Sequence, residues 1–308
     1  MEDELQLRIH GDDSLPTLIY LPGLHGDWTL IGGFLQALDG RVRFVEITYP
    51  RTLDWSLDDY AAAIEAALAQ NGITSGWLLG ESFGSQPLWV LVTRASSRAG
   101  VESALCADFS IRRLDTTTTL NGSSVTSPHP APEHNFHIEG VILAGGFVKH
   151  PMRLTIWLAE RLTGRMSNAL FVWIIFSYAK ISKFRHRNSP RILARIEEFV
   201  ARRTDLDRRA AQHRLHLIAG FDPRPIARQA KLPIFGLSGI LDPIVPWPLV
   251  RRWLKRNCPA LRDYKIIKSA DHNVLATAPR QAASQVLEWM NGFAASACRR
   301  DCPTDLPH

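Results

Sequence analysis

The sequence is poor in cysteine and in long apolar runs, and both absences narrow the class of protein. Its 308 residues include only Cys106, Cys258, Cys298 and Cys302, whose spacing fits no zinc motif. Four cysteines are also too few to staple a chain of this length. The longest apolar stretch, ALFVWIIF at Ala169–Phe176, is much shorter than the roughly 20 residues of a membrane-spanning helix. We therefore expect neither a disulfide scaffold nor a transmembrane segment.

The N-terminus lacks the features of a secretory signal. It reads MEDELQLRIHGDD, which is acidic and has neither a basic start nor an apolar core. Together with the few cysteines, this predicts reduced thiols and a cytoplasmic protein. Hydrophobic residues make up 45% of the chain and charged residues 21%, values that exclude global disorder and fibrous repeats.

Short apolar runs alternate with helical stretches along most of the chain. Run lengths of this kind favour strands over helices. A typical intervening segment is LDDYAAAIEAALAQNG, where Asn71 and Gly72 end the helical pattern. The alternation predicts an α/β fold with parallel strands covered by helices on both faces. The predicted strands are Thr17–Leu21, Val42–Ile47, Gly76–Gly80, Gly140–Gly145, Leu232–Ser238 and Tyr264–Lys268.

Two segments interrupt this alternation. Residues 96–136 contain TTTT and NGSSVTSPHPAPEHN, a composition that buries little apolar surface and predicts a flexible surface insert. Residues 149–231 have no strand-like run, but Thr204 and Asp207 resemble a capping box and Gly220 can end the helix that follows. We expect a helical cap at 149–231, a core formed by 1–148 and 232–296, and a disordered tail at 297–308.

The strongest chemical signal is Gly80-Glu81-Ser82-Phe83-Gly84. The motif follows the apolar run Trp77-Leu78-Leu79 and precedes a helix-like stretch, which is the strand, turn and helix setting that presents a nucleophilic serine. Glycines at both ends allow close approach of neighbouring chain, and the helix N-terminus favours developing negative charge. The alternative is a glycine-rich turn with an incidental serine.

A serine hydroxyl needs a base to become a nucleophile, and the chain offers a base and an orienting acid. His272 follows one predicted strand in SADHNVLA, and Asp242 follows another in SGILDPIVP. Both lie just past strand C-terminal ends, where open α/β sheets place their sites. We predict that His272 is the general base and that Asp242 orients it. Taken alone, His272 would more readily be interpreted as a loop histidine, and its position and its partner Asp242 reverse that preference. The adjacent Asp271 is expected to be solvated.

An oxyanion needs two backbone donors. The first predicted donor is the amide of Phe83, directly after the serine. The second should come from the loop PGLHGD after the strand Thr17–Leu21. We favour Leu24, because Gly23 stands directly beyond the strand end, although the pair His25-Gly26 would point to Asp27 instead.

These motifs together resemble the α/β-hydrolase-fold serine hydrolases. The LPGLHGD loop, the GESFG elbow, the LDPIVP acid turn and the ADHN histidine loop occur in the order of that family, with Ser82 before Asp242 and His272. The PGL loop and elbow are similar to carboxylesterases near the pimeloyl-acyl-carrier-protein methyl ester carboxylesterase group, although the 96–136 insert and the short loop depart from that pattern. The resemblance implies a helical cap after the sixth strand of the fold. It also implies ester hydrolysis through an acyl-enzyme, without a metal or organic cofactor.

The serine nucleophile indicates acyl transfer, and simple esters are the leading expectation. We predict a carboxylesterase for short- to medium-chain acyl esters. A hydrolase of carrier-protein-linked esters or thioesters is one alternative, and a non-catalytic ligand-binding relative is another.

The two interrupting segments should lie at opposite edges of the sheet. The 96–136 insert follows the helix after the elbow and should lie far from Ser82, so we do not expect it to be a lid. The cap should rise over Ser82 and shape the substrate pocket. Its aromatic side chains either pack the cap onto the core or line an acyl channel. The predicted substrate-binding residues are Trp157, Phe171, Trp173 and Phe176.

The net charge of +6 is unevenly distributed. Residues 151–231 contain 17 Lys and Arg against 6 Asp and Glu, a local net charge of +11, so the remainder carries −5. These charges either solvate helix faces or form a basic surface suited to an acidic carrier protein, an anionic substrate or an anionic surface. A small-molecule acyl ester is the expected substrate, and we expect no nucleic-acid partner.

Overall fold

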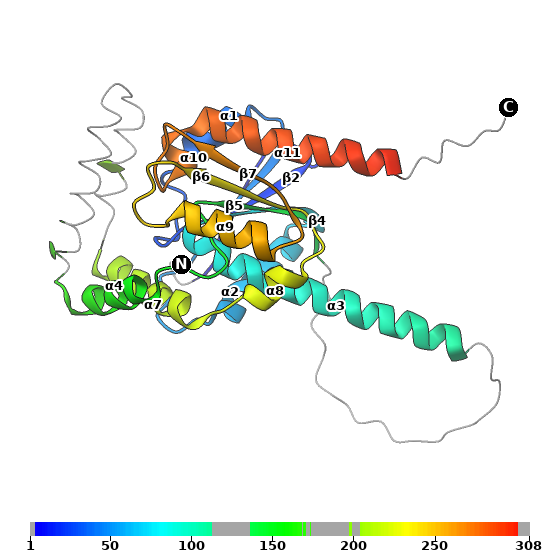
Figure 1. The fold of residues 1–308 in the computed structure, drawn as a ribbon, viewed down its shortest axis with the longest axis horizontal. Helices are drawn as coiled ribbons and strands as arrows, with labels where there is room; N and C mark the ends of the chain where they lie inside the picture. Colours follow the sequence, from blue (N-terminus) through cyan, green and yellow to red (C-terminus); the bar gives the residue numbers. More distant parts are fainter. Residues whose placement is uncertain are drawn as a thin grey trace, which may run out of the picture.

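The computed structural model describes residues 4–112, 136–167, 169–170, 173, 197–198 and 204–300 (Figure 1). In these residues seven strands form one sheet in the order β1-β3-β2-β4-β5-β6-β7. Only β1 is antiparallel to its neighbour. The strands are β1 (Gln6–His10), β2 (Thr17–Leu21), β3 (Arg43–Thr48), β4 (Ser75–Glu81), β5 (His137–Ala144), β6 (Ile234–Gly239) and β7 (Leu261–Ile267).

Helices cover both faces of the sheet, as Figure 1 shows. One face carries α1 (Gly32–Leu38), α10 (Val274–Thr277) and α11 (Pro279–Arg300), and the other carries α2 (Leu57–Gln70), α3 (Ser85–Arg112), α8 (Arg224–Gln229) and α9 (Trp247–Asn257). The two faces follow from side-chain alternation along the strands. In β4, Trp77 and Leu79 belong to one apolar core and Leu78 belongs to the other.

The predicted α/β architecture and its six strands are confirmed. The additional strand, β1, has the sequence QLRIH and lies at the edge of the sheet, paired only with β3. Its polar residues hid it from a search for apolar runs, because an edge strand is only partly buried.

The insert predicted at 96–136 begins later than expected. Helix α3 continues through Arg112, so 96–112 is helical rather than a loop. This part, SSRAGVESALCADFSIR, has no proline to end the helix, and the Thr- and Pro-rich sequence starts beyond it. Residues 113–135 lie outside the described residues. The chain re-enters at Phe136, and the His137 amide donates to the Thr74 carbonyl just before β4, at the edge of the sheet opposite Ser82.

The segment between β5 and β6 is helical where the structure describes it. β5 is the fifth strand in chain order, and α4 (Arg153–Arg165) and α7 (Asp205–Gly220) follow it and pack together. The predicted capping box is present at Thr204 and Asp207, and α7 ends at Gly220. By contrast, α8 packs on α3, and its Ala227 belongs to the core of the sheet.

Helix α7 is attached to core loops near the C-terminal ends of the strands. Arg51 pairs with Asp207 at 2.9 Å, and His213 Nε2 lies 2.8 Å from the Trp55 carbonyl oxygen. These contacts place the helical segment on the same side of the sheet as the ends of β2 and β3.

The C-terminal boundary also differs from the prediction. Helix α11 extends through Arg300, so the expected tail at 297–308 begins as helix, and 301–308 lies outside the described residues. Among the helices in the described stretches, none has the length and apolar character needed to cross a bilayer.

Candidate active site

Ser82 lies on a strained turn between β4 and α3. Its φ of 50° is in the left-handed region, which is uncommon for any residue other than glycine. A Cβ added to Gly84 would lie 2.1 Å from the Leu21 carbonyl oxygen, and one on Gly80 would lie 2.9 Å from Leu88. The glycines of the GESFG motif are therefore required by the close approach of neighbouring chain, as a nucleophile elbow demands.

The structure brings Ser82, His272 and Asp242 into one hydrogen-bonded series. His272 Nε2 lies 2.8 Å from Ser82 Oγ, and His272 Nδ1 lies 2.9 Å from Asp242 Oδ2. The other carboxylate oxygen, Oδ1, accepts the backbone amides of Ile244 at 2.8 Å and Val245 at 2.9 Å. The acid turn thus fixes the Asp242 carboxylate, which in turn fixes the imidazole.

This hydrogen bonding determines the His272 tautomer. A carboxylate only accepts hydrogen bonds, so Nδ1 carries the proton and Nε2 presents its lone pair to the Ser82 hydroxyl. Burial alone lowers the pKa of His272, but the hydrogen bond and charge of Asp242 outweigh it with help from Glu81 and Asp271, and the pKa is raised. The surroundings therefore stabilise the imidazolium that forms when His272 takes a proton from Ser82.

The loop after β2 passes directly beside Ser82. A Cβ on Gly23 would lie 3.6 Å from the Ser82 Cβ. The Gly23 carbonyl accepts the Gly26 amide at 2.9 Å, so the N–H of Leu24, in the same peptide group as that carbonyl, points the opposite way. The Phe83 amide lies in the first turn after the elbow, where amides lack acceptors within the helix.

Two further carboxylates adjoin His272, and neither was predicted to matter. Glu81 is buried and accepts a short hydrogen bond from the Tyr20 hydroxyl, and burial raises its pKa despite that bond. Asp271 is 2% exposed, which corrects the expectation of a solvated side chain. It accepts the Asn273 amide at 3.0 Å and the Thr277 hydroxyl at 3.2 Å, so it shapes the turn that carries His272.

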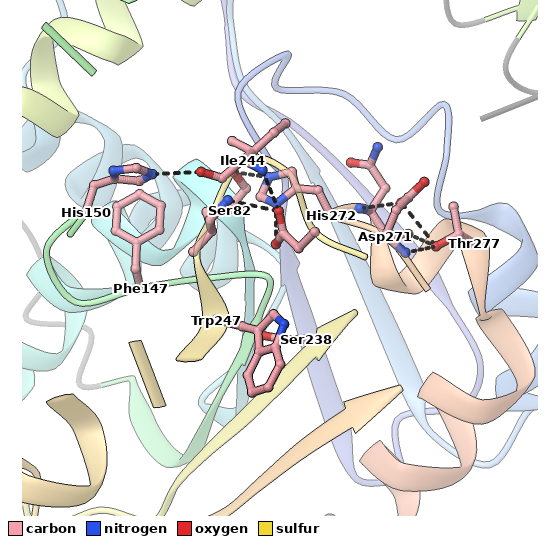
Figure 2. A network of polar contacts seen from close by, with 12 residues as sticks. Ser82, Phe147, His150, Ser238, Ile244, Trp247, Asp271, His272 and Thr277 are labelled. Atoms are coloured by element: carbon pink, nitrogen blue, oxygen red, sulfur yellow. Dashed lines mark hydrogen bonds and ion pairs between the residues drawn. The ribbon is translucent and has the colours of Figure 1, made fainter. Parts of the chain in front are cut away.

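Figure 2 shows a polar network that extends from His150 past Ser82 and His272 to Asp271 and Thr277. His150 lies between β5 and α4, where its Nδ1 accepts the Met152 amide at 3.2 Å. Its Nε2 must then carry the proton, which it donates to the Ile244 carbonyl at 3.3 Å. Burial lowers the pKa of His150, in keeping with this neutral tautomer. The residue joins the start of the helical segment to the acid turn.

The predicted pocket residues are only partly described. Trp157 on α4 and Trp173 expose 45% and 63% of their surface, and the Arg161 guanidinium lies 4.8 Å from the Trp157 ring. Phe171 and Phe176 lie outside the described residues. A role for these four in substrate binding stays a prediction. Among the described residues, no group of three or more His, Cys, Asp or Glu side chains is arranged to hold a metal ion.

Comparison with known proteins defines the fold. No family model matches the chain, and no curated protein matches it in sequence. Solved structures do match along almost its whole length, and they include hydrolases, esterases and an α/β hydrolase from a deep-sea metagenome library. The chain has the α/β-hydrolase fold.

Three of these structures illustrate the similarity. A hydrolase from Pseudomonas aeruginosa PA01 superposes with a TM-score of 0.67 at 12% identity, covering 93% of this chain and 94% of that one. An esterase from Exiguobacterium antarcticum gives 0.66 at 10% identity, with 93% and 95% covered. An enol-lactonase from Burkholderia xenovorans LB400 gives 0.63 at 16% identity, with 93% and 96% covered.

Proposed function

We propose that this protein is a serine hydrolase that cleaves carboxylic esters through an acyl-enzyme. The observation that carries the proposal is the series Ser82–His272–Asp242, with distances of 2.8 and 2.9 Å, built on an elbow where Ser82 has a φ of 50°. The similarity to solved esterases supports it at the level of the fold.

In the acylation step, Ser82 Oγ attacks the carbonyl carbon of the ester while His272 Nε2 takes the hydroxyl proton. The carbonyl oxygen becomes an oxyanion and accepts hydrogen bonds from the Leu24 and Phe83 amides. Asp242 holds the imidazolium through Nδ1–H. When the tetrahedral intermediate collapses, the bond to the alcohol oxygen breaks and His272 gives its proton to the departing alcohol.

In the deacylation step, water replaces the alcohol. His272 takes a proton from the water as its oxygen attacks the acyl carbon, and the same two amides stabilise the second oxyanion. Collapse releases the carboxylic acid and returns the proton to Ser82 Oγ. Besides the ester and one water molecule, the proposed cycle uses side chains and amides of this chain.

Short- to medium-chain acyl esters are the proposed substrates. Apolar side chains are exposed on α4 and on the acid turn, where they offer contact area to an acyl chain. Leu154 is 75% exposed, Leu162 52% and Ile244 47%. We also propose that the helical segment from residue 149 through the end of α7 at Gly220 forms a cap over the core, with Trp157, Phe171, Trp173 and Phe176 as substrate contacts.

Nitrophenyl esters from acetate to palmitate provide the test. The wild-type protein should hydrolyse the shorter members, and Ser82→Ala should lose at least about 10³-fold in kcat, because the variant lacks the hydroxyl that His272 activates. Ser269→Ala is the matched control, since this serine near His272 is exposed and its hydroxyl donates to the Gln281 side chain at 3.0 Å, away from Ser82. If the wild-type protein shows no Ser82-dependent turnover at any chain length, the proposal of an esterase is refuted and a non-catalytic ligand-binding protein is favoured.

A carrier-protein-linked ester or thioester is the second candidate substrate, favoured by the local charge of +11 over residues 151–231. An acidic carrier attracted to this segment would make the rate fall steeply with added salt, whereas the rate on a small neutral ester would stay nearly constant. Equal salt dependence of the two rates would count against this candidate and against an anionic surface as a partner.

A further inference from the structure

A buried arginine of the helical segment contacts the loop beside Ser82. Arg214, on α7, is 1% exposed and forms no ion pair with a carboxylate in the part of the chain that the structure describes. Its guanidinium donates to the carbonyls of Leu24 and Pro50, both at 2.8 Å, and to the Tyr60 hydroxyl at 3.2 Å. Each of the three guanidinium nitrogens, which together form a planar fork, therefore has a neutral acceptor.

Such an arrangement is costly for stability alone. Removing a charge from water carries a large penalty, and apolar residues of similar volume often replace buried charges without loss. The three acceptors come from separate core segments, and only a planar fork can reach all of them at once. A role for Arg214 therefore lies in the groups that its guanidinium holds in place.

The fork completes the restraint on Leu24. The peptide group before Leu24 is held by the hydrogen bond from the Gly26 amide to the Gly23 carbonyl, at 2.9 Å. The peptide group after Leu24 is held by Arg214 through the Leu24 carbonyl. With both flanking peptide planes fixed, the direction of the Leu24 N–H is fixed as well.

The loop lies directly against the guanidinium. A Cβ on Gly26 would lie 2.6 Å from Arg214 Nη1, and Gly26 has a φ of +74°, so only glycine fits between loop and fork. The Arg214 guanidinium carbon also lies 5.9 Å from the ring centre of Phe83, whose amide is the other proposed oxyanion donor. One side chain thus donates to the carbonyl of one donor residue and lies over the ring of the other.

We propose that Arg214 is a positioning residue of the oxyanion hole: its fork holds the Leu24 peptide so that the Leu24 N–H faces the oxyanion formed on Ser82. This inference rests on the proposed function. The inference extends the proposed function, because it makes α7, a helix inserted between two strands, partly responsible for the geometry of the oxyanion hole. A residue that acts in this way affects the transition state more than the bound substrate.

Arg214→Met and Arg214→Lys test the inference with nitrophenyl butyrate as substrate. Methionine fills much of the volume without a fork, and lysine keeps the charge but is a single point donor. Both variants should lose about tenfold to a hundredfold in kcat while KM changes less than about threefold, since removing an oxyanion donor costs about 10² to 10³-fold. Inhibition by butylboronic acid, whose adduct on Ser82 resembles the tetrahedral intermediate, should weaken by a similar factor.

Arg208→Met is the matched control on the same helix. Arg208 pairs with Asp205 at 2.8 Å and donates to the Thr163 carbonyl at 2.7 Å, so these contacts join α7 to α4 and do not involve the loop after β2 that carries Leu24. This variant should lower Tm and leave kcat within about twofold of wild type. If Arg214→Met does not fold, Arg214→Lys and Gly26→Ala decide, because the added methyl group must displace the fork.

The outcomes separate the inference from the proposed function. Wild-type protein without Ser82-dependent turnover would overturn the function and this inference with it. An active wild type whose folded Arg214→Lys or Arg214→Met variant keeps kcat within about twofold would overturn the inference alone. A loss confined to KM, or an equal loss of kcat in Arg208→Met, would do the same.

Discussion

Replacement of Asp242 by asparagine should keep the geometry of the site and remove most of its activity. The Oδ1 position accepts two backbone amides, those of Ile244 at 2.8 Å and Val245 at 2.9 Å. An asparagine must keep its carbonyl oxygen there, because turning its NH₂ toward two N–H donors would break both hydrogen bonds, at about 0.5–1.5 kcal/mol each. The NH₂ then faces Nδ1 of His272.

That orientation selects the wrong tautomer of His272. Nδ1 must now accept, so Nε2 carries the proton and can no longer take one from Ser82. In serine hydrolases with this arrangement the wrong tautomer lowers kcat by about 10⁴-fold, which corresponds to about 5.4 kcal/mol. We expect Asp242→Asn to lose activity on this scale with little change in fold, because size and backbone contacts are kept.

The assay is kcat for nitrophenyl butyrate, with Tm and circular dichroism as checks of folding. Asp12→Asn is the control, because Asp12 also accepts a local backbone amide, that of Ser14 at 2.9 Å, but lies at an exposed turn. A loss of less than about tenfold in Asp242→Asn would refute the role of Asp242. The buried carboxylate of Glu81 would then become the candidate partner of His272.

Two other predictions follow from the residues around Ser82. Because the raised pKa of His272 receives a contribution from Glu81, Glu81→Gln should move the acid limb of the kcat/KM profile to lower pH; an unmoved limb would contradict this. Because the pKa of Glu81 is raised in the folded protein, ionisation of Glu81 destabilises the wild type as pH rises. The stability difference between Glu81→Gln and wild type, measured by urea unfolding, should therefore favour the variant more at about pH 8 than at about pH 4. Gly84→Ala should lower the free energy of unfolding by about 3 kcal/mol or more and remove most activity, because the added Cβ would lie 2.1 Å from the Leu21 carbonyl oxygen. Gly292→Ala in α11 should raise the free energy of unfolding by about 0.5–1 kcal/mol, because a Cβ there would meet nothing within 4 Å. Equal urea midpoints for the two variants would refute this contrast.

The sequence predicted the parts of the molecule that depend on local patterns. Buried parallel strands such as β4 are recognisable as apolar runs, and the elbow is recognisable because Gly80 and Gly84 flank a serine between a strand and a helix. Their positions just past strand C-terminal ends and their order along the chain sufficed to expect His272 and Asp242 near Ser82, and the structure brings these three together.

The remaining features depend on long-range packing, which local patterns do not record. Asp271 looks like a loop residue until its turn closes on Thr277, and His150 carries no motif at all. Arg214 did leave a signal, because it follows Ala211 and precedes Ile218 at helical spacing on the buried face of α7. A charged residue at such a position calls for a buried partner, but its partner, the Leu24 carbonyl, is 190 residues distant in sequence.

The central claim is that Ser82 is the activated nucleophile, and covalent labelling tests it most directly. An alkyl fluorophosphonate should form a single adduct, mass spectrometry should locate it on Ser82, and hydrolysis of nitrophenyl butyrate should disappear in proportion to labelling. His272→Ala should label far more slowly, because the serine hydroxyl then lacks its base. Ester hydrolysis that survives complete labelling of Ser82, or an adduct at another residue, would contradict the account.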